Sequence, residues 1–519
     1  MSFLRRFGGF LRDDTRTFAV AACMTAIAGT VAAGWAPAVS TTVASGPARS
    51  LGEPAAARDS AVSAVVATSF GPSGAQVRAW TRPASSGSWT AAGLVLPAGF
   101  GSSYDASAAA SPGGPLLVVA GTSPAGESCI TNGSVAIANV YPTGRLGPAR
   151  LVSDQRGTGR FDDRPVVTIG TGGTVWVAWS EGPDSDACEN VGTGDRLEVA
   201  ASHDGGRTFG APVTMPAEGG GSAFGARLAP LGGGRVAVSW TERMSGGDEA
   251  VLVSVLQAGG QVTRPQPVLR GDALPLVLPG ASFYDFPAGD VTALPGGKLV
   301  VAAPFWRSGR SVIDLAVGTP GGRWQASAVN PPAGADLLLP ALGPLTSASA
   351  RLLCAVHDRA GDRLGYDWAD LRIDGRGYGI VSAGLASLTP SPSGPGFFEL
   401  GEELSMTQTP SGLLSAVVVA GSGGAALETR SWAVPRPAAT LPPSARPSPS
   451  RPDATRHGVS DAARPGSPWA WPVTWTAAAI IICAGLFAAR AASARGCERG
   501  GGVAAAWRRR PRRPRRPGG

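Results

Sequence analysis

A hairpin-rich unit recurs along most of the chain, and this repetition restricts the folds open to it more than any other feature of the sequence. Tight turns flanked by short apolar runs return about every 52 to 63 residues. The runs are rich in β-branched and aromatic residues, which predicts four antiparallel strands per unit. The turns lie at Gly113-Gly114, Gly172-Gly173, Gly232-Gly233-Gly234, Gly296-Gly297, Ser347-Ala348-Ser349 and Ser411-Gly412.

Four-strand units at a regular period are typical of a β-propeller, in which each blade buries its faces against its neighbours. We therefore predict an all-β propeller over residues 60–433. The N-terminal part adds strands at Val62–Phe70, Gln76–Thr81 and Trp89–Leu96, and the C-terminal repeat supplies three more. Counting strands gives seven blades, or six if the two end segments merge into one. Either way, pairing of the ends would close the ring without an exposed sheet edge.

The turn Ser202–Phe209 (SHDGGRTF) carries the most specific motif. Its carboxylate can accept backbone N–H bonds within the turn, and its glycines can adopt positive φ. Phe209 offers an apolar ring to bury against the next unit. The stretch resembles the Asp-box, or BNR repeat, of sialidase-like propellers, with its pattern carried by Ser202, Asp204, Gly206, Thr208 and Phe209. In that family the motif is a structural turn on the outer hairpin, so the resemblance implies the fold more than an activity.

The N-terminus is typical of a secretory signal. Four arginines, at positions 5, 6, 12 and 16, precede the apolar run Thr17–Gly34, and small residues follow. We predict a signal peptide with a signal helix over residues 1–38 and a short linker over 39–59. An uncleaved signal anchor is the alternative.

The C-terminal part reads as a stalk and a membrane anchor. Residues 434–468 hold nine prolines and predict an extended linker. Trp469–Ala489 is uncharged, mostly apolar and long enough for a transmembrane helix. Arginines at the start of the 490–519 tail predict a cytoplasmic C-terminus. The expected location is thus the cell membrane, with one span and the propeller outside.

Charge distribution argues against nucleic-acid binding. The net charge is +8, but the tail holds ten arginines and one glutamate, +9, which leaves 8 − 9 = −1 for the rest. The body is therefore not a basic surface. Lys298 is the only lysine, which indicates the coding bias of a GC-rich bacterial genome.

Cysteine usage predicts one disulfide and no metal centre. Cys129 and Cys188 each lie in the loop after a second strand, in adjacent units, so their loops share one face. In an exported protein this predicts a disulfide, with two free thiols as the alternative. Cys354 lies in an apolar run and is expected to be buried and inert. No spacing resembles a zinc site.

The segments that lead into each first strand should surround the central opening of a propeller. In several of them an aromatic residue stands beside an acid, a combination that suits sugars and also a Ca²⁺ ion. The alternative is that each aromatic packs between blades and each acid binds backbone. The expected ligand-binding residues are Tyr104, Asp105, Asp162, Asp285, Asp290 and Glu399.

Sialidase chemistry implies a more demanding set of residues. That family uses three arginines to clamp a carboxylate, a tyrosine nucleophile paired with a glutamate, and an aspartate as acid/base. Its Arg-Ile-Pro motif is missing, and Asp163-Arg164-Pro165 matches that motif only in part. The candidates that the resemblance implies are Asp163, Arg164, Arg227, Tyr284, Glu402 and Glu403.

The Asp-box motif is complete, whereas the set of sialidase catalytic residues is incomplete. This combination favours a binding module over an enzyme. We expect the propeller to bind a carbohydrate or an envelope protein, without a cofactor. The alternatives are a sialidase-like exo-glycosidase, and a purely structural platform if side chains fill the opening.

Overall fold

The computed structural model describes residues 39–433, except 47–50, 72–73, 112, 128–129, 187–194, 219–220, 245–246, 276, 284–287, 375–376, 386–387, 392–403 and 422–423. Apart from a short 3-10 turn at Asp184–Asp186, the regular elements of these ranges are β-strands. The predicted signal peptide, stalk, transmembrane segment and tail lie outside the described residues. Among those described, no helix has the length and apolar character needed to span a bilayer.

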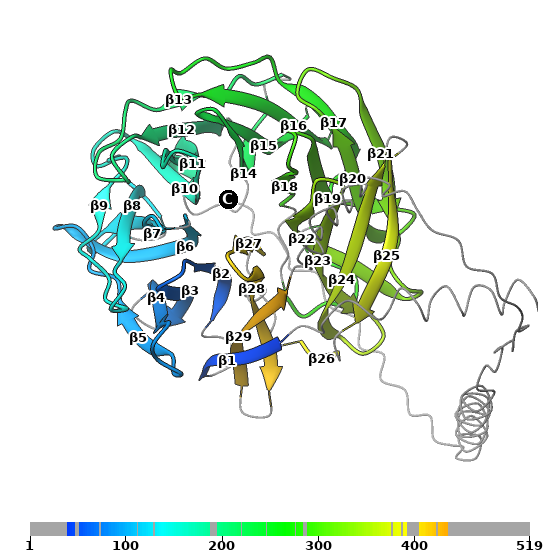
Figure 1. Cartoon of the computed structure of the whole chain (residues 1–519), viewed down its shortest axis with the longest axis horizontal. Coiled ribbons are helices and arrows are strands. Elements are labelled where there is room, and N and C mark those ends of the chain that lie inside the picture. The colour runs from blue at the N-terminus through cyan, green and yellow to red at the C-terminus, as the bar shows by residue number, and fades with distance from the viewer. Residues whose placement is uncertain are drawn as a thin grey trace, which may run out of the picture. The chain divides into compact units, whose positions relative to one another are not determined.

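Consecutive strands form small antiparallel sheets (Figure 1). The first sheet contains β2 (Gly52–Arg58), β3 (Val62–Gly71), β4 (Gly74–Pro83) and β5 (Thr90–Gly93). The second contains β6 (Phe100–Ala110), β7 (Leu116–Pro124), β8 (Ser134–Val140) and β9 (Arg150–Leu151). The third contains β10 (Arg160–Ile169), β11 (Val175–Pro183), β12 (Arg196–Ser202) and β13 (Val213–Thr214).

The rest of the chain continues this pattern in three further sheets. One contains β14 (Ala223–Gly232), β15 (Arg235–Arg243), β16 (Asp248–Gln257), β17 (Gln266–Asp272), β18 (Asp290–Ala293), β19 (Leu299–Arg307), β20 (Arg310–Gly318) and β21 (Trp324–Val329). The next contains β22 (Ala335–Thr346), β23 (Ser349–Asp358), β24 (Arg363–Asp374), β25 (Gly377–Leu385) and β26 (Thr389–Pro390). The last contains β27 (Met406–Thr409), β28 (Gly412–Gly421), β29 (Gly424–Ala433) and β1 (Val39–Gly46).

The all-β propeller is confirmed, but the expected count of six or seven separate blades is wrong. Five blades of four or five strands are separate sheets, and the other eight strands form one continuous sheet. The physical cause is a link between two four-strand groups, β14–β17 and β18–β21. Asp272 of β17 pairs with Trp306 of β19, and the Arg307 guanidinium donates to the Arg270 carbonyl at 3.4 Å.

Residues 39–59 are not the linker that we predicted. β1 is the outer strand of the last sheet and pairs antiparallel with β29, with Val39 opposite Ser431. β2 is the inner strand of the first sheet. Both strands cover edges that would otherwise stay unpaired, which is the physical reason for their order.

Apolar side chains of neighbouring sheets pack together all the way round the ring. Residues of β2–β4 pack on β6–β8, and residues of β6–β8 pack on β10–β12. The same packing joins β10–β12 to β14–β16, β14–β16 to β18–β20, and β18–β20 to β22–β24. Side chains of β28 and β29 then pack on β22–β24 at one face and on β2–β4 at the other. Burial between sheets is therefore what closes the ring and holds the inner strands around its centre (Figure 1).

Candidate functional site

The inner strands enclose a cavity of about 630 Å³. Its walls come from β2, β6, β10, β14, β18, β22 and β27, which contact one another in this order around the centre. Alanine, valine and leucine side chains make up much of the lining. The volume lies within the range of about 300–1,000 Å³ usual for small-molecule sites.

Five ionisable side chains on five successive inner strands line this cavity, and we call them the charged collar. They are Glu53, Asp105, Arg164, Arg227 and Asp290. Around the ring the collar reads acid, acid, arginine, arginine, acid. Leu342 and Leu404 complete the circle with apolar groups. The cavity thus has one mixed-charge arc and one uncharged arc, to which β27 adds the polar residues Thr407, Gln408 and Thr409.

The collar is built on a bulge that recurs in the inner strands. Glu53, Asp105 and Arg164 have left-handed φ angles of 51°, 46° and 51°, and the register shifts at each of them. Leu339 of β22 and Gly225 of β14 do the same, with φ of 46° and 65°. A positive φ is costly for a residue other than glycine, and such strain concentrates at binding and active sites. In β2, β6 and β10 the bulge residue is itself a collar member, so the bulge sets the direction of Glu53, Asp105 and Arg164.

Collar carboxylates also hold neighbouring strands together. Asp290 accepts from the amide of Val291 at 2.8 Å and from that of Leu342, on the next inner strand, at 2.6 Å. Its Oδ1 lies 3.7 Å from the Arg227 Nε. Glu53 accepts from the Asp105 amide at 3.2 Å. These contacts fix the acids in place, in line with the backbone-binding role that was the alternative for them.

The structure brings four of the predicted residues to the cavity wall: Asp105, Arg164, Arg227 and Asp290. Asp163 lies beside Arg164, its Oδ2 3.8 Å from the Arg164 Nε, but is not part of the lining. The predicted residues Tyr284, Asp285, Glu399, Glu402 and Glu403 lie outside the described residues. Glu53 is not among the predicted residues, because the sequence pattern predicts a linker over residues 39–59. The Glu53-Pro54 pair, like Arg164-Pro165, was the signal available for it.

Tyr104 and Asp162 do not reach the cavity, contrary to expectation. Tyr104 is buried, and its hydroxyl donates to the backbone carbonyl of Asp162 at 3.0 Å. Its ring lies against Gly121. Side chains alternate between the faces of a strand, so Tyr104 points away from the face of its neighbour Asp105. In β10 the register shift between Asp163 and Val166 separates Asp162 from Arg164.

Replacing Gly121 by alanine should destabilise the fold by about 1–3 kcal/mol, since overpacking a core forces neighbours to shift. An added Cβ would lie 2.2 Å from the Tyr104 ring. The free energy of unfolding of the full chain in urea measures this loss. Tyr104→Phe is the matched variant: it loses only one hydrogen bond, worth about 1 kcal/mol. A Gly121→Ala variant as stable as the parent would contradict the packing described.

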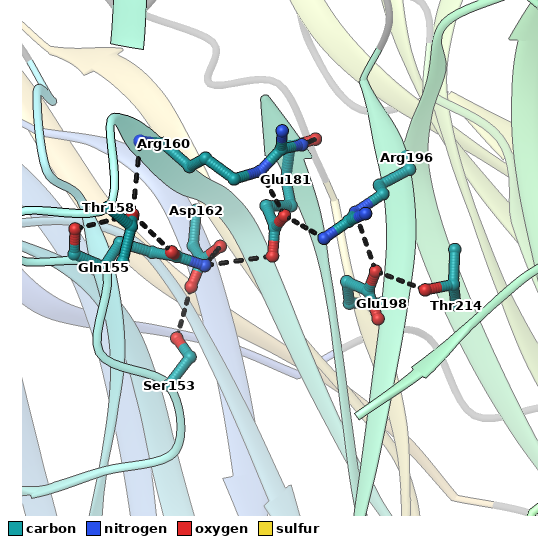
Figure 2. A network of polar contacts seen from close by, with 9 residues as sticks. All are labelled: Ser153, Gln155, Thr158, Arg160, Asp162, Glu181, Arg196, Glu198 and Thr214. Carbon is teal, nitrogen blue, oxygen red and sulfur yellow. Dashed lines mark hydrogen bonds and ion pairs between the residues drawn. The ribbon is translucent and has the colours of Figure 1, made fainter. Parts of the chain in front are cut away.

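The Asp162 carboxyl lies in a buried polar network at the start of β10 (Figure 2). It accepts from the Ser153 hydroxyl and, at 2.9 Å, from the Gln155 amide, which also donates to Glu181 at 2.9 Å. Burial raises the pKa of Asp162 to about 7, against the effect of these hydrogen bonds, and the nearby Glu181 charge adds to the rise. This carboxyl therefore changes charge near neutral pH.

Two arginines complete the network from the solvent side. Arg160 and Arg196 both pair with Glu181, and the Arg196 Nε lies 3.0 Å from Glu198. The Thr214 hydroxyl donates to Glu198 at 2.7 Å (Figure 2). The acids are buried and the arginines are partly exposed. Because the contacts run from one strand to the next, the network links β10, β11, β12 and β13.

The Ser202–Phe209 turn between β12 and β13 is closed by its own side chains. The Asp204 carboxylate accepts from the amides of Arg207 and Thr208, each at 2.9 Å, and from the Thr208 hydroxyl at 2.7 Å. The hydrogen bond from that hydroxyl is the main reason that the pKa of Asp204 lies well below its usual range. The Gly206 amide donates to the Ser202 hydroxyl oxygen at 2.9 Å.

The same turn packs on the preceding sheet, not on the next one as expected. Phe209 contacts the core cluster that includes Leu117 and Ile137. The Arg150 guanidinium, from the same preceding sheet, donates to the Gly206 carbonyl at 2.7 Å. The turn therefore joins two blades at the rim, far along the sheet from the inner strands that carry the collar.

Cys354 is buried in β23, and burial raises the pKa of its thiol, as suits an inert group. Cys129 and Cys188 lie outside the described residues, so their disulfide stays a prediction. Within the described ranges, no group of three or more His, Cys, Asp or Glu side chains is placed to hold a metal ion.

Comparisons with known proteins give likenesses of fold. No protein-family model matches the chain, and no curated protein matches it. Similar solved structures include a protein of unknown function from Dyadobacter fermentans, with 14% identity, a TM-score of 0.41, and coverage of 66% of this chain and 97% of that one. A Trypanosoma rangeli sialidase has 11% identity, a TM-score of 0.39, and coverage of 63% and 55%. An ulvan lyase has 11% identity, a TM-score of 0.46, and coverage of 75% and 95%.

Proposed function

We propose that the propeller is a binding module that takes a glycan into its central cavity. The observation that carries this proposal is the charged collar: five ionisable groups, on five successive inner strands, around a cavity of about 630 Å³. Sugar hydroxyls donate to carboxylates and accept from guanidinium groups, so a mixed collar can satisfy both of their roles. The small apolar side chains of the wall suit the C–H faces of a sugar ring.

The collar is prepared for a ligand before one arrives. Arg227 is 7% exposed and Arg164 is 8% exposed, and Arg227 donates to the Ala226 carbonyl at 2.9 Å. Side chains fixed in this way lose little conformational entropy when a ligand binds, which favours affinity. In the described part of the wall, two arginines and three acids face the cavity. That set supports binding more directly than the three-arginine clamp that a sialidase would need.

We propose that this module lies outside the cell. The secretory signal expected at residues 1–38 and the apolar segment 469–489 support an exported propeller with a membrane anchor. Its natural ligands would then be glycans of the cell envelope or of a neighbouring surface.

A glycan microarray probed with the full chain tests the proposal, and calorimetry on the best ligand gives its Kd. Arg164→Gln and Arg227→Gln should each raise the Kd at least tenfold, about 1.4 kcal/mol, because each removes a charged hydrogen-bond donor from the cavity. Arg235→Gln is the matched control. Arg235 is exposed on β15, so this variant should bind the glycan with the same Kd as the parent.

Two outcomes would count against a binding module. Absence of binding to every glycan on the array would remove the proposal. Turnover of a fluorogenic sialoside or glycoside, lost on substitution of Glu402 or Glu403, would make the protein a glycosidase instead.

A further inference from the structure

Two acids of the collar form a hydrogen-bonded pair. Glu53 of β2 and Asp105 of β6 lie on adjacent inner strands, both at the left-handed bulge position, and both line the cavity. The Glu53 carboxyl is hydrogen-bonded to the side chain of Asp105 and also accepts from the Asp105 amide at 3.2 Å. The Thr68 hydroxyl of β3 donates to the same Glu53 oxygen. A proton on one of two carboxyls in such contact lets that carboxyl donate to the other, because ionised carboxylates have no donor.

The surroundings explain why this pair keeps its proton. Burial raises the pKa of Glu53, while hydrogen bonds with Asp105 and Thr68 oppose the rise, and the Asp163 charge on β10 adds to it. Tyr104 of β6 lies nearby, and burial keeps its hydroxyl protonated by raising its pKa. A cation that replaced the shared proton would let both carboxyls ionise at once.

We propose that the Glu53–Asp105 pair is a subsite for the protonated amino group of an amino sugar, within the glycan-binding function proposed above, on which it rests. An ammonium group carries three N–H donors and one charge, which matches two adjacent carboxylates. Arg164 and Arg227 repel that group from the neighbouring arc and offer donors to the hydroxyl oxygens of the same ligand. The order of charges around the ring therefore gives the ligand a single orientation. Calcium fits less well, because it takes about six to eight oxygen ligands.

Calorimetry on the full chain tests this subsite with two probes, the glucosamine tetramer and the N-acetylglucosamine tetramer, at pH 6.5. The free-amine tetramer should bind at least tenfold more tightly, because acetylation removes the charge. Binding should also release a proton, seen as an enthalpy that depends on the ionisation enthalpy of the buffer. Glu53→Gln and Asp105→Asn should each abolish the proton release, since an amide beside a carboxylate needs no shared proton. Each should also reduce the preference for the free-amine tetramer, since only one carboxylate remains to bind the ammonium group. Both replacements are isosteric, and asparagine tolerates the left-handed φ of position 105.

The outcomes separate this inference from the function beneath it. Equal or tighter binding of the acetylated tetramer, with other glycans still bound on the array, would overturn the amine subsite and leave glycan binding standing. A purely structural pair would lower stability in Glu53→Gln and leave the ratio of the two affinities unchanged, which would also overturn it. Failure of every glycan to bind would remove the proposed function itself.

Discussion

An Arg351→Ala variant is expected to lose about 3–5 kcal/mol of unfolding free energy, because it leaves the buried Asp370 carboxylate without its charge partner. Arg351 of β23 is 1% exposed and pairs with Asp370 of β24, which is 2% exposed. The pair is bidentate, with the Arg351 Nε donating to Oδ1 at 2.6 Å and Nη2 donating to Oδ2 at 2.8 Å. Removing the guanidinium leaves the carboxylate in a low-dielectric environment without its charge partner.

The same side chain connects two sheets. The guanidinium carbon of Arg351 lies 4.7 Å from the ring centroid of Trp368 and 5.4 Å from that of Trp432. Trp368 belongs to β24, whereas Trp432 belongs to β29, the strand that pairs with the N-terminal β1. Cation–π contacts of this kind add about 0.5–2 kcal/mol. Loss of Arg351 should therefore weaken the packing next to the closing sheet as well as the ion pair.

Urea unfolding of the full chain, followed by tryptophan fluorescence, measures the effect directly. The double variant Arg351→Met with Asp370→Leu should recover most of the loss, since apolar replacement of a buried pair is often neutral. Arg363→Gln is the matched control, because the Arg363 side chain is 50% exposed in its pair with Asp358. A loss below about 1 kcal/mol in Arg351→Ala would show that the pair is hydrated and not buried.

Local sequence pattern predicts the second strand of each unit well. The run Val175–Ser180 forms the first part of β11, and the turn before it is closed by Gly172 and Gly173 with φ of 97° and 83°. Only glycine adopts positive φ easily at both positions, so the glycine pair predicts this turn. Strands dominated by valine, leucine and tryptophan are recognisable for the same reason.

The first strands are much harder to predict. β2 has the sequence GEPAAAR, with no β-branched residue, and exists because the neighbouring sheets cover it. β1 pairs with β29 across almost the whole chain, a contact that no local pattern encodes. Tertiary context overrides propensity in both strands, and this is why Glu53 was not among the predicted site residues.

The choice of cavity-facing residues within a strand could not be predicted either. Asp162, Asp163 and Arg164 are consecutive, yet Asp162 is buried in the polar network and Arg164 lines the cavity. Strict alternation would assign these two residues to the same face. The bulge between Asp163 and Val166 breaks that alternation. Predicting the site from sequence therefore requires knowing where the bulge falls, and the X-Pro pairs at 53–54, 164–165 and 339–340 mark it in three strands.

The second large effect concerns pH. The stability difference between the parent chain and Asp162→Asn should fall by about 2–4 kcal/mol as the pH rises from about 4 to 7.5. The pKa of Asp162 rises from its ordinary 3.8 to about 7 in the folded chain, chiefly through burial. Each unit of pKa difference is worth about 1.4 kcal/mol, which sets the upper limit near 4 kcal/mol.

The sign follows from proton binding. Between the two pKa values the folded chain holds a proton on Asp162 that the unfolded chain has released, so stability declines as the pH rises. The contribution is complete below the unfolded pKa and is lost by the time the pH passes the folded value of about 7. Asparagine keeps the shape of the group, including an acceptor for Gln155, but does not titrate in this range.

Urea unfolding of both chains at pH 4.5, 6 and 7.5 isolates the group, because other buried acids titrate equally in each. Asp154→Asn provides a control of opposite sign: a hydrogen bond from Arg156 lowers the pKa of Asp154, so its contribution is lost as the pH falls. That control is small, since the Asp154 side chain is 42% exposed. If the parent and Asp162→Asn followed parallel pH curves, water would have to reach the Asp162 carboxyl, and the network of Figure 2 would be open to solvent.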